Sequence, residues 1–236
     1  MNILFNSDCY NQIEKLIEQG IKVDCIITDP PYDISTTNGG GTINKVKKLN
    51  ESLKEINLAK IDKGYDIEKF NSLFLKIMKN VNIYVFCNKI QIPEYFDFYV
   101  MKLKCKFDII CWHKTNALPT YSNKYLSDTE YCLHFKKGAS VHPESYEDAK
   151  TYYIAPINHE DKKEYNHPTI KPLDLIEKFV RNSTKKDDLI LDPFMGSGTT
   201  GVACKKLNRD FIGIELNKEY YNIAKERIEN EQRICF

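Results

Sequence analysis

The chain has 236 residues, of which 34 are Lys or Arg and 33 are Asp or Glu, so the formal net charge is +1. This length can bury a substantial core and predicts a single domain over residues 1–236 that carries an inserted region. A charge this close to zero provides no overall field for a polyanionic partner, so composition neither requires nor excludes nucleic acid.

The cysteines and the N-terminal residues bear on the compartment. The eight cysteines include no C-x-x-C pair, and several lie in apolar, strand-like runs. That pattern favours reduced thiols in a cytosolic protein over a disulfide framework or a zinc site. The start, MNILFNSDCY, has no basic region followed by a long apolar run, and no window approaches about eighteen consecutive apolar residues. We expect a cytoplasmic protein that is neither secreted nor membrane-spanning.

Short runs rich in Ile and Val alternate with segments of helical period, which predicts an α/β fold with a mostly parallel, seven-stranded sheet and helices on both faces. In chain order, strands are expected over 2–5, 23–28, 81–87, 106–112, 129–135, 187–191 and 210–214, and helices over 9–19, 66–79, 91–103, 172–183, 200–207 and 217–230.

Two long segments interrupt this alternation. Residues 33–64 contain three adjacent glycines, and residues 113–168 scatter aromatic side chains among polar ones. Loops of this length in an α/β domain are usually functional or disordered.

The stretch IITDPPYD contains Asp29, Pro30, Pro31 and Tyr32 directly after an apolar strand. Each proline lacks a backbone N–H and pushes the preceding residue toward extended geometry. The Asp29 carboxylate and the Pro30 carbonyl are therefore predicted to protrude as fixed acceptors, with the Tyr32 ring just beyond them.

The stretch DDLILDPFMGSGTTG runs from an apolar strand through a glycine-rich turn into a helix, and Glu215 ends the next strand. Gly196, Gly198 and Gly201 satisfy G-x-G-x-x-G, so a nicotinamide-dependent dehydrogenase has to be weighed. Only 21 residues follow Glu215, which leaves no room for a second mononucleotide half. No Lys follows the glycines as a P-loop requires. The turn could also be a tight connection without a ligand, but the acid on the next strand favours a nucleoside-sized ligand with the shape of S-adenosylmethionine.

Together, the tetrapeptide Asp29–Tyr32 and the run Asp192–Thr200 resemble the amino-methylating DNA methyltransferases, which use S-adenosylmethionine and have a seven-stranded, Rossmann-like sheet. The stretch HPTIKP, His167–Pro172, matches a further motif of that family, and WHKTNALP, Trp112–Pro119, matches more loosely. The catalytic tetrapeptide precedes the glycine turn, which is the motif order of the β group. In that order target recognition lies between the two motifs, so the resemblance implies that 113–168 is the insertion that selects the target and that 33–64 is a loop region on the catalytic side.

The resemblance implies a role for each residue of the tetrapeptide Asp29–Tyr32, which we call the acid-proline elbow. Asp29 and the Pro30 carbonyl would accept the two N–H bonds of an adenine amino group, and Tyr32 would stack on a base flipped out of double-stranded DNA. No metal is needed. The near alternative is a cytosine-N4 enzyme, which more often carries Ser in place of Asp29. The alternative from another class is a catalytically silent DNA-binding module, although every catalytic position is intact here.

The resemblance also assigns the remaining residues. Cofactor binding falls on Asp8, His167, Lys171, Asp192, Phe194, Gly196, Gly198, Thr199, Thr200 and Glu215, with a helix cap as the alternative for Asp8. DNA contacts are predicted for Lys45, Lys47, Lys48, Lys114 and Lys124, with an ordinary solvated face as the alternative. A cognate restriction endonuclease and a homodimer are further partners to consider.

Overall fold

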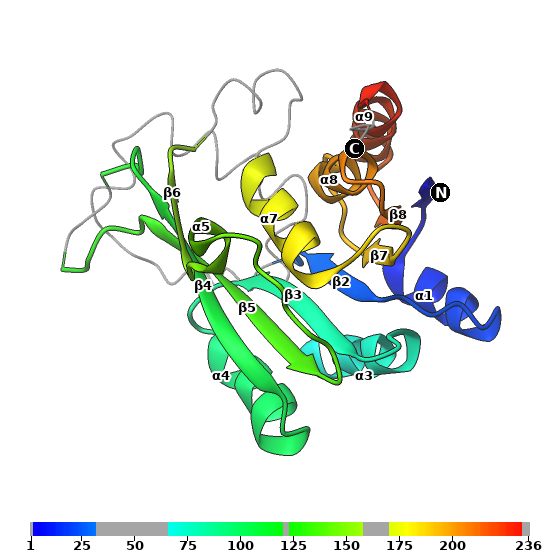
Figure 1. The fold of residues 1–236 in the computed structure, drawn as a ribbon, viewed down its shortest axis with the longest axis horizontal. Coiled ribbons are helices and arrows are strands. Elements are labelled where there is room, and N and C mark those ends of the chain that lie inside the picture. Colours follow the sequence, from blue (N-terminus) through cyan, green and yellow to red (C-terminus); the bar gives the residue numbers. More distant parts are fainter. Residues whose placement is uncertain (1, 32–65, 120–122, 158–169, 233–236) are drawn as a thin grey trace.

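The computed structural model describes residues 2–31, 66–119, 123–157 and 170–232. Within them, eight strands form one sheet in the order β1-β8-β7-β2-β3-β5-β4-β6 (Figure 1). The strands are β1 (Asn2–Asn6), β2 (Cys25–Thr28), β3 (Val81–Cys87), β4 (Lys106–Lys114), β5 (Thr129–Lys137), β6 (Tyr152–Ala155), β7 (Leu189–Asp192) and β8 (Asp210–Glu215).

Strand β5 is the one strand of this sheet that runs against its neighbours. It pairs antiparallel with β3 and with β4, whereas the other strand pairs are parallel. The predicted mostly parallel sheet is therefore confirmed. Every described strand except β5 ends at the same edge of the sheet, and the chain segments that follow these strands gather there.

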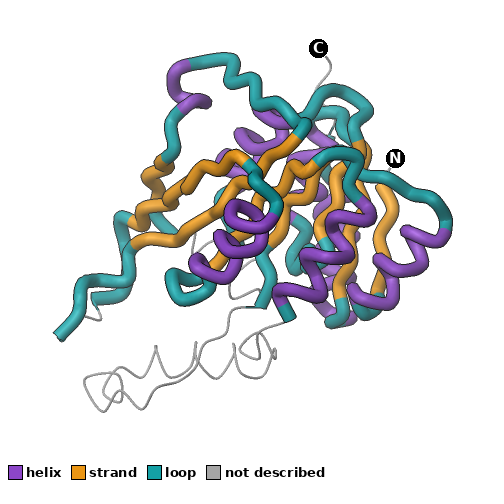
Figure 2. Tube along the Cα trace, turned by 90° about the horizontal axis from the view of Figure 1, so that it is seen from below, coloured by secondary structure: helices purple, strands orange, loops and turns teal. Residues whose placement is uncertain are grey.

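Helices cover both faces of the sheet, as predicted (Figures 1 and 2). One face carries α1 (Cys9–Glu18), α3 (Ile67–Ile77), α4 (Ile92–Phe96) and the π-helix η2 (Asp97–Lys102), and the other carries α7 (Leu173–Ser183), α8 (Thr199–Lys206) and α9 (Lys218–Asn230). Strand β2 shows why both layers form. Its Ile26 packs with the first group of helices, whereas Cys25 and Ile27 pack with the second, because successive side chains of a strand point to opposite faces.

The structure differs from the sequence prediction at β6 and in the segment that follows β3. The eighth strand, β6, lies inside the region expected to be irregular, and a short helix α5 (Tyr146–Ala149) precedes it. With four residues, β6 is too short to show a period. It becomes a strand by pairing with β4, where Tyr152 lies opposite Cys111. The single helix expected over 91–103 is divided into α4 and η2. No helix in the described segments is long and apolar enough to cross a membrane.

Candidate active site

The acid-proline elbow and the glycine turn leave neighbouring strands at the same edge of the sheet. Asp29 directly follows β2, and Asp192 is the last residue of β7. The two strands are parallel neighbours, with Ile26 opposite Leu191. Two motifs far apart in the sequence are therefore side by side, as a single active site requires.

The glycine turn needs its glycines for both conformation and space. Gly196 and Gly198 have φ angles of 50° and 83°, a left-handed region that L side chains rarely adopt. A Cβ at Gly198 would also lie 2.9 Å from the Ala224 Cβ of α9. From the same helix, an Arg227 Nη1 donates to the Ser197 carbonyl at 2.7 Å. The turn is thus held rigidly against α9.

Asp192 stabilises the turn from inside. Its buried carboxylate accepts hydrogen bonds from the Thr200 hydroxyl at 2.7 Å and from the Phe194 amide at 3.1 Å. Thr200 and Thr199 are the first residues of α8, and both are buried. Burial raises the pKa of Asp192 to about 7. In the structure Asp192 therefore shapes the turn by binding other protein groups.

The raised pKa of Asp192 predicts a specific pH dependence of stability. The folded protein binds a proton here that the unfolded chain releases near its ordinary value, so this contribution to stability is lost as pH rises from about 4 toward 7. Replacing Asp192 with Asn removes the titration while keeping an oxygen acceptor for the Phe194 amide. Relative to the original protein, we expect Asp192→Asn to gain about 2–3 kcal/mol in free energy of unfolding between pH 5 and pH 8. Urea unfolding of both proteins at the two pH values measures this. If the two proteins differed in free energy of unfolding by the same amount at pH 5 and at pH 8, the prediction would be contradicted.

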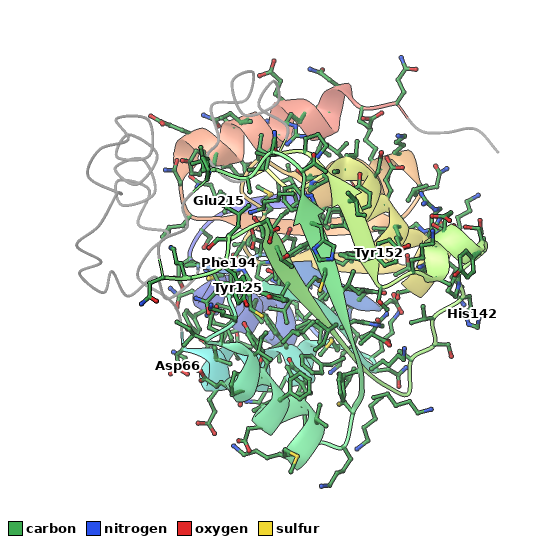
Figure 3. All side chains as sticks on the ribbon, turned by 90° about the vertical axis from the view of Figure 1, so that its left-hand side faces the viewer. Asp66, Tyr125, His142, Tyr152, Phe194 and Glu215 are labelled. Carbon is green, nitrogen blue, oxygen red and sulfur yellow. The ribbon has the colours of Figure 1, made fainter. Side chains whose placement is uncertain are left out.

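Glu215 lies at the end of β8, beside the turn (Figure 3). Its Oε2 accepts from the Gly196 amide at 3.0 Å and its Oε1 from the Asn217 amide at 2.7 Å. Burial raises the pKa of this carboxyl. Because a carboxylate has about four acceptor sites, these two bonds fix its position and leave capacity for the hydroxyls of a ribose.

Phe194 lies at the same side of the molecule (Figure 3). Its ring centroid is 5.1 Å from that of Phe70 on α3, which in turn lies 4.0 Å from the Tyr10 ring on α1. The sequence motif included Phe194 but gave no sign of the two aromatic residues that support it. Aromatic residues in a helix usually indicate packing in the hydrophobic core and not support for a binding site.

Asp8 acts as the N-terminal cap of α1, where its Oδ1 accepts from the Asn11 amide at 3.0 Å. The helix-cap alternative is therefore present in the structure. The cofactor role of Asp8 stays a prediction.

Four charged side chains from different elements meet beside the elbow. Lys171, which precedes α7, forms an ion pair with Asp29, and its Nζ lies 3.2 Å from Glu130 Oε2 on β5. The other oxygen of Glu130 lies 2.6 Å from the Lys114 Nζ on β4. The Lys171 side chain is only 8% exposed and its ammonium lies 4.9 Å from the centroid of the Phe86 ring. We call Asp29, Lys171, Glu130 and Lys114 the charge chain.

Comparison with known proteins identifies the family. The family model for N6/N4 DNA methylases matches residues 23–226, which contain the elbow, the glycine turn and Glu215. The chain belongs to this DNA methylase family. The methylase is 32% identical to the type II methyltransferase M2.DpnII of Streptococcus pneumoniae, over 97% of this chain and 90% of that protein. It is 28% identical to M.HpaI of Haemophilus parainfluenzae, over 94% of this chain and 74% of that protein.

Solved structures agree with this assignment. The methylase matches M1.HpyAVI, solved as a complex with SAM, with a TM-score of 0.70 and 32% identity, over 96% of this chain and all of that one. It also matches the cytosine-N4-specific PvuII DNA methyltransferase with a TM-score of 0.71, over 96% of this chain and 86% of that one. At 16% identity the second likeness shows the shared fold alone.

Several predicted site residues of the methylase lie outside the described segments, namely Tyr32, Lys45, Lys47, Lys48 and His167. Among the described ones, Lys171 contacts Asp29, the predicted catalytic acid. Lys114 points inward to Glu130 with 16% of its side chain exposed, so a DNA contact would compete with that ion pair. Lys124 is exposed on the connection between β4 and β5, next to Tyr125, which is 98% exposed.

Glu130 was missed by sequence reasoning. It lies in a strand of ordinary alternation, TEYCLHFKK, where a polar residue at the strand start reads as solvent-facing. Its position next to Lys171 depends on the order of strands in the sheet, and no local pattern reports that order.

Proposed function

We propose that this methylase transfers a methyl group from S-adenosylmethionine to the exocyclic amino nitrogen of adenine, within a specific sequence of double-stranded DNA. One observation carries the proposal. Asp29 and Pro30 follow β2 directly beside the glycine turn that follows β7, and Glu215 ends β8 on the far side of that turn.

S-adenosylmethionine fits the turn side of the site. Glu215 is a partly buried carboxylate whose position two backbone amides fix, and it would accept the ribose hydroxyls. Phe194 and the turn amides would contact the rest of the nucleoside, and roles for Asp8, His167 and Lys171 at either end are part of the proposal. When bound, the cofactor supplies a methyl group on a positively charged sulfur, so departure of the thioether needs no metal.

The elbow residues act on the target base. An adenine amino group is a poor nucleophile because its lone pair is delocalised into the ring. The Asp29 carboxylate accepts one N–H through a charge-assisted bond, and the Pro30 carbonyl accepts the other. Pro31 has no N–H to compete for these acceptors, and Tyr32 stacks on the base. Such positioning can lower the barrier by up to about 7–11 kcal/mol relative to free reactants.

Asp29 supports adenine over cytosine as the target, since cytosine-N4 enzymes of this family more often carry Ser at that position. The shared fold with the PvuII enzyme carries no weight for either base. Either target atom is buried in a duplex, so the base has to rotate out of the stack, at a cost of a few kcal/mol that DNA contacts must offset.

The insertion 113–168 is proposed to select the target sequence, and the 33–64 segment, which lies outside the described residues, to contact DNA from the catalytic side. The described part of the insertion is docked firmly on the fold. Lys178 of α7 donates to the Lys150 carbonyl at 2.6 Å, and Asn182 donates to the Asp148 carbonyl at 2.8 Å. Because β4 ends and β5 begins at the edge that holds Asp29, their connection leaves the sheet beside the active site.

Lys124 on this connection is expected to contact a DNA phosphate. Lys124→Ala should weaken DNA binding about equally for all sequences and reduce the slope of log K against log salt by about one. The control is Lys106→Ala, because Lys106 is an exposed residue at the opposite end of β4. Titrations of labelled duplex at several salt concentrations measure the slope. An equal slope for Lys124→Ala and the original protein would remove Lys124 from the interface.

The proposed function is tested by incubating the protein with mixed-sequence DNA and labelled S-adenosylmethionine, then sequencing for the modified base and its context. We expect N6-methyladenine in one short sequence. N4-methylcytosine would replace the target assignment, and cofactor and DNA binding without methylation would favour the silent module. A cognate restriction endonuclease, a homodimer and a cytoplasmic location belong to the proposal as expected accompaniments of such an enzyme.

A further inference from the structure

The charge chain is built into the active site by four separate elements. Asp29 follows β2, Lys171 precedes α7, Glu130 lies on β5 and Lys114 ends β4. Successive members are in ion-pair contact, and the Lys171 side chain at its centre is 8% exposed. A buried ammonium group is costly unless carboxylates surround it. Here it has one on each side.

The two central groups of the chain, Lys171 and Glu130, have shifted pKa values. Burial alone would lower the pKa of Lys171, but the carboxylates of Asp29 and Glu130 outweigh burial and raise it. Burial opposes ionisation of Glu130 as well, yet the ammonium groups of Lys171 and Lys114 lower its pKa to about 2. Carboxyl and amino groups alternate along the chain.

We propose that Lys171 and Glu130 are positioning residues for methyl transfer: Lys171 keeps the Asp29 carboxylate ionised and aimed, and Glu130 fixes Lys171 and balances its charge. This inference rests on the proposed function, in which Asp29 receives an N–H of the target base. A carboxylate has about four acceptor sites, so Asp29 can bind Lys171 and the base together.

Glu130 has a distinct part in this arrangement. Without Glu130, the ammonium group of Lys171 would add positive charge to a pocket that would also receive a sulfonium cofactor and an amino nitrogen that gains positive charge as it reacts. The Glu130 carboxylate offsets that charge. Glu130 and Lys114 also lie at the two roots of the connection that is proposed to meet DNA, where the Lys114 amide donates to the Asp128 carbonyl at 2.7 Å.

Other titratable groups near Asp29 come from the elements packed around it, namely Cys87 of β3, Cys132 of β5, Tyr95 of α4 and Asp192 of β7. Burial raises the pKa of Cys87 to about 12 and raises those of Cys132 and Tyr95 as well, so these three stay neutral between pH 5 and pH 9. Asp192 titrates within that range. Because Asp192 is present in every variant below, the comparison between variants isolates the charge chain.

The test compares Lys171→Met, Lys171→Arg and Glu130→Gln with two matched controls. Lys178→Met removes a lysine whose side chain is also buried but whose ammonium donates to the Glu147 and Lys150 carbonyls. Glu177→Gln removes a buried carboxylate that pairs with Lys206 instead. For each protein, kcat and KM for DNA and S-adenosylmethionine are measured from pH 5.5 to pH 9, and thermal unfolding is followed at pH 5 and pH 8 without ligands.

For Lys171→Met we expect the acid limb of the kcat profile to move up by about one pH unit or more, because the Asp29 carboxylate loses its neighbouring cation. KM for S-adenosylmethionine reports separately on the cofactor role proposed for Lys171, and Lys171→Arg should restore the limb. Glu130→Gln should lower kcat at every pH without raising the limb. A double variant that combines Lys171→Met with Glu130→Gln should have a kcat no lower than that of Lys171→Met, because both changes interrupt one chain.

Thermal unfolding gives a readout without catalysis. Lys171→Met should lower Tm more at pH 8 than at pH 5, because the unpaired carboxylates take up protons at low pH, whereas Lys178→Met should lower Tm equally at both. An unmoved limb with a uniform loss of kcat in Lys171→Met would overturn the inference. If Lys171→Met does not fold, the other variants still test the inference. It is overturned if the acid limb of the kcat profile moves up in Glu130→Gln, or if the profile of Lys171→Arg differs from that of the original protein. If the original protein methylates no DNA, the proposed function fails, and the unfolding data still decide the charge chain.

Discussion

Replacing Asp29 with alanine is expected to reduce methyl transfer to DNA by about 1,000-fold, while the fold and S-adenosylmethionine binding persist. The change removes the charged acceptor that holds one N–H of the target amino group. It leaves the core intact because the Asp29 side chain is 24% exposed at the end of β2. Lys171 would keep its contact with Glu130. Single-turnover methylation of a short duplex measures the rate, and calorimetry measures the cofactor affinity.

A matched control lies at the other end of the same strand. Asp24 directly precedes β2, pairs with Lys79 at 2.8 Å and accepts the Leu189 amide at 3.0 Å. Asp24→Ala should cost about 1–2 kcal/mol in free energy of unfolding and leave methyl transfer unchanged. Wild-type activity in Asp29→Ala would refute the role assigned to the elbow. Asp29→Asn, which keeps an acceptor without the charge, should fall between the two.

The second large effect concerns Glu215. Glu215→Ala is expected to raise the Kd for S-adenosylmethionine by about 100-fold or more, because hydrogen bonds to a charged group contribute about 1.5–3 kcal/mol each. The change removes the acceptor proposed for the ribose hydroxyls. It also removes the carboxylate that fixes the amides of Gly196 and Asn217. Calorimetric titration with the cofactor provides the measurement.

Glu219 offers the comparison for Glu215, because it is an exposed carboxylate four residues further along the chain, in the first turn of α9. Glu219→Ala should leave the Kd within about twofold, as expected of a surface change away from the site. Equal cofactor affinity in Glu215→Ala and Glu219→Ala would place the ribose elsewhere.

Much of the fold follows from the sequence alone. The buried strands β3, β7 and β8 read as apolar runs because both of their faces are covered, and the helices between them show helical period because one stripe faces the sheet. Observed strand ends lie within a few residues of those predicted. Local chemistry also identified the glycine turn, since its positive φ angles restrict the choice of residue.

The sequence by itself determined the candidate site residues: an acid before two prolines, a turn that only glycine can form, and an acid at the end of the next strand. Tertiary structure alone decided which of them meet. Strand order places β2 beside β7, makes a strand of β6 by pairing it with β4, and brings Lys171 between Asp29 and Glu130. The physical reason is that the sequence shows a lysine or a glutamate but not whether its side chain ends in water or in a pocket. Whether its charge is solvated or paired depends on neighbours that only the folded chain supplies.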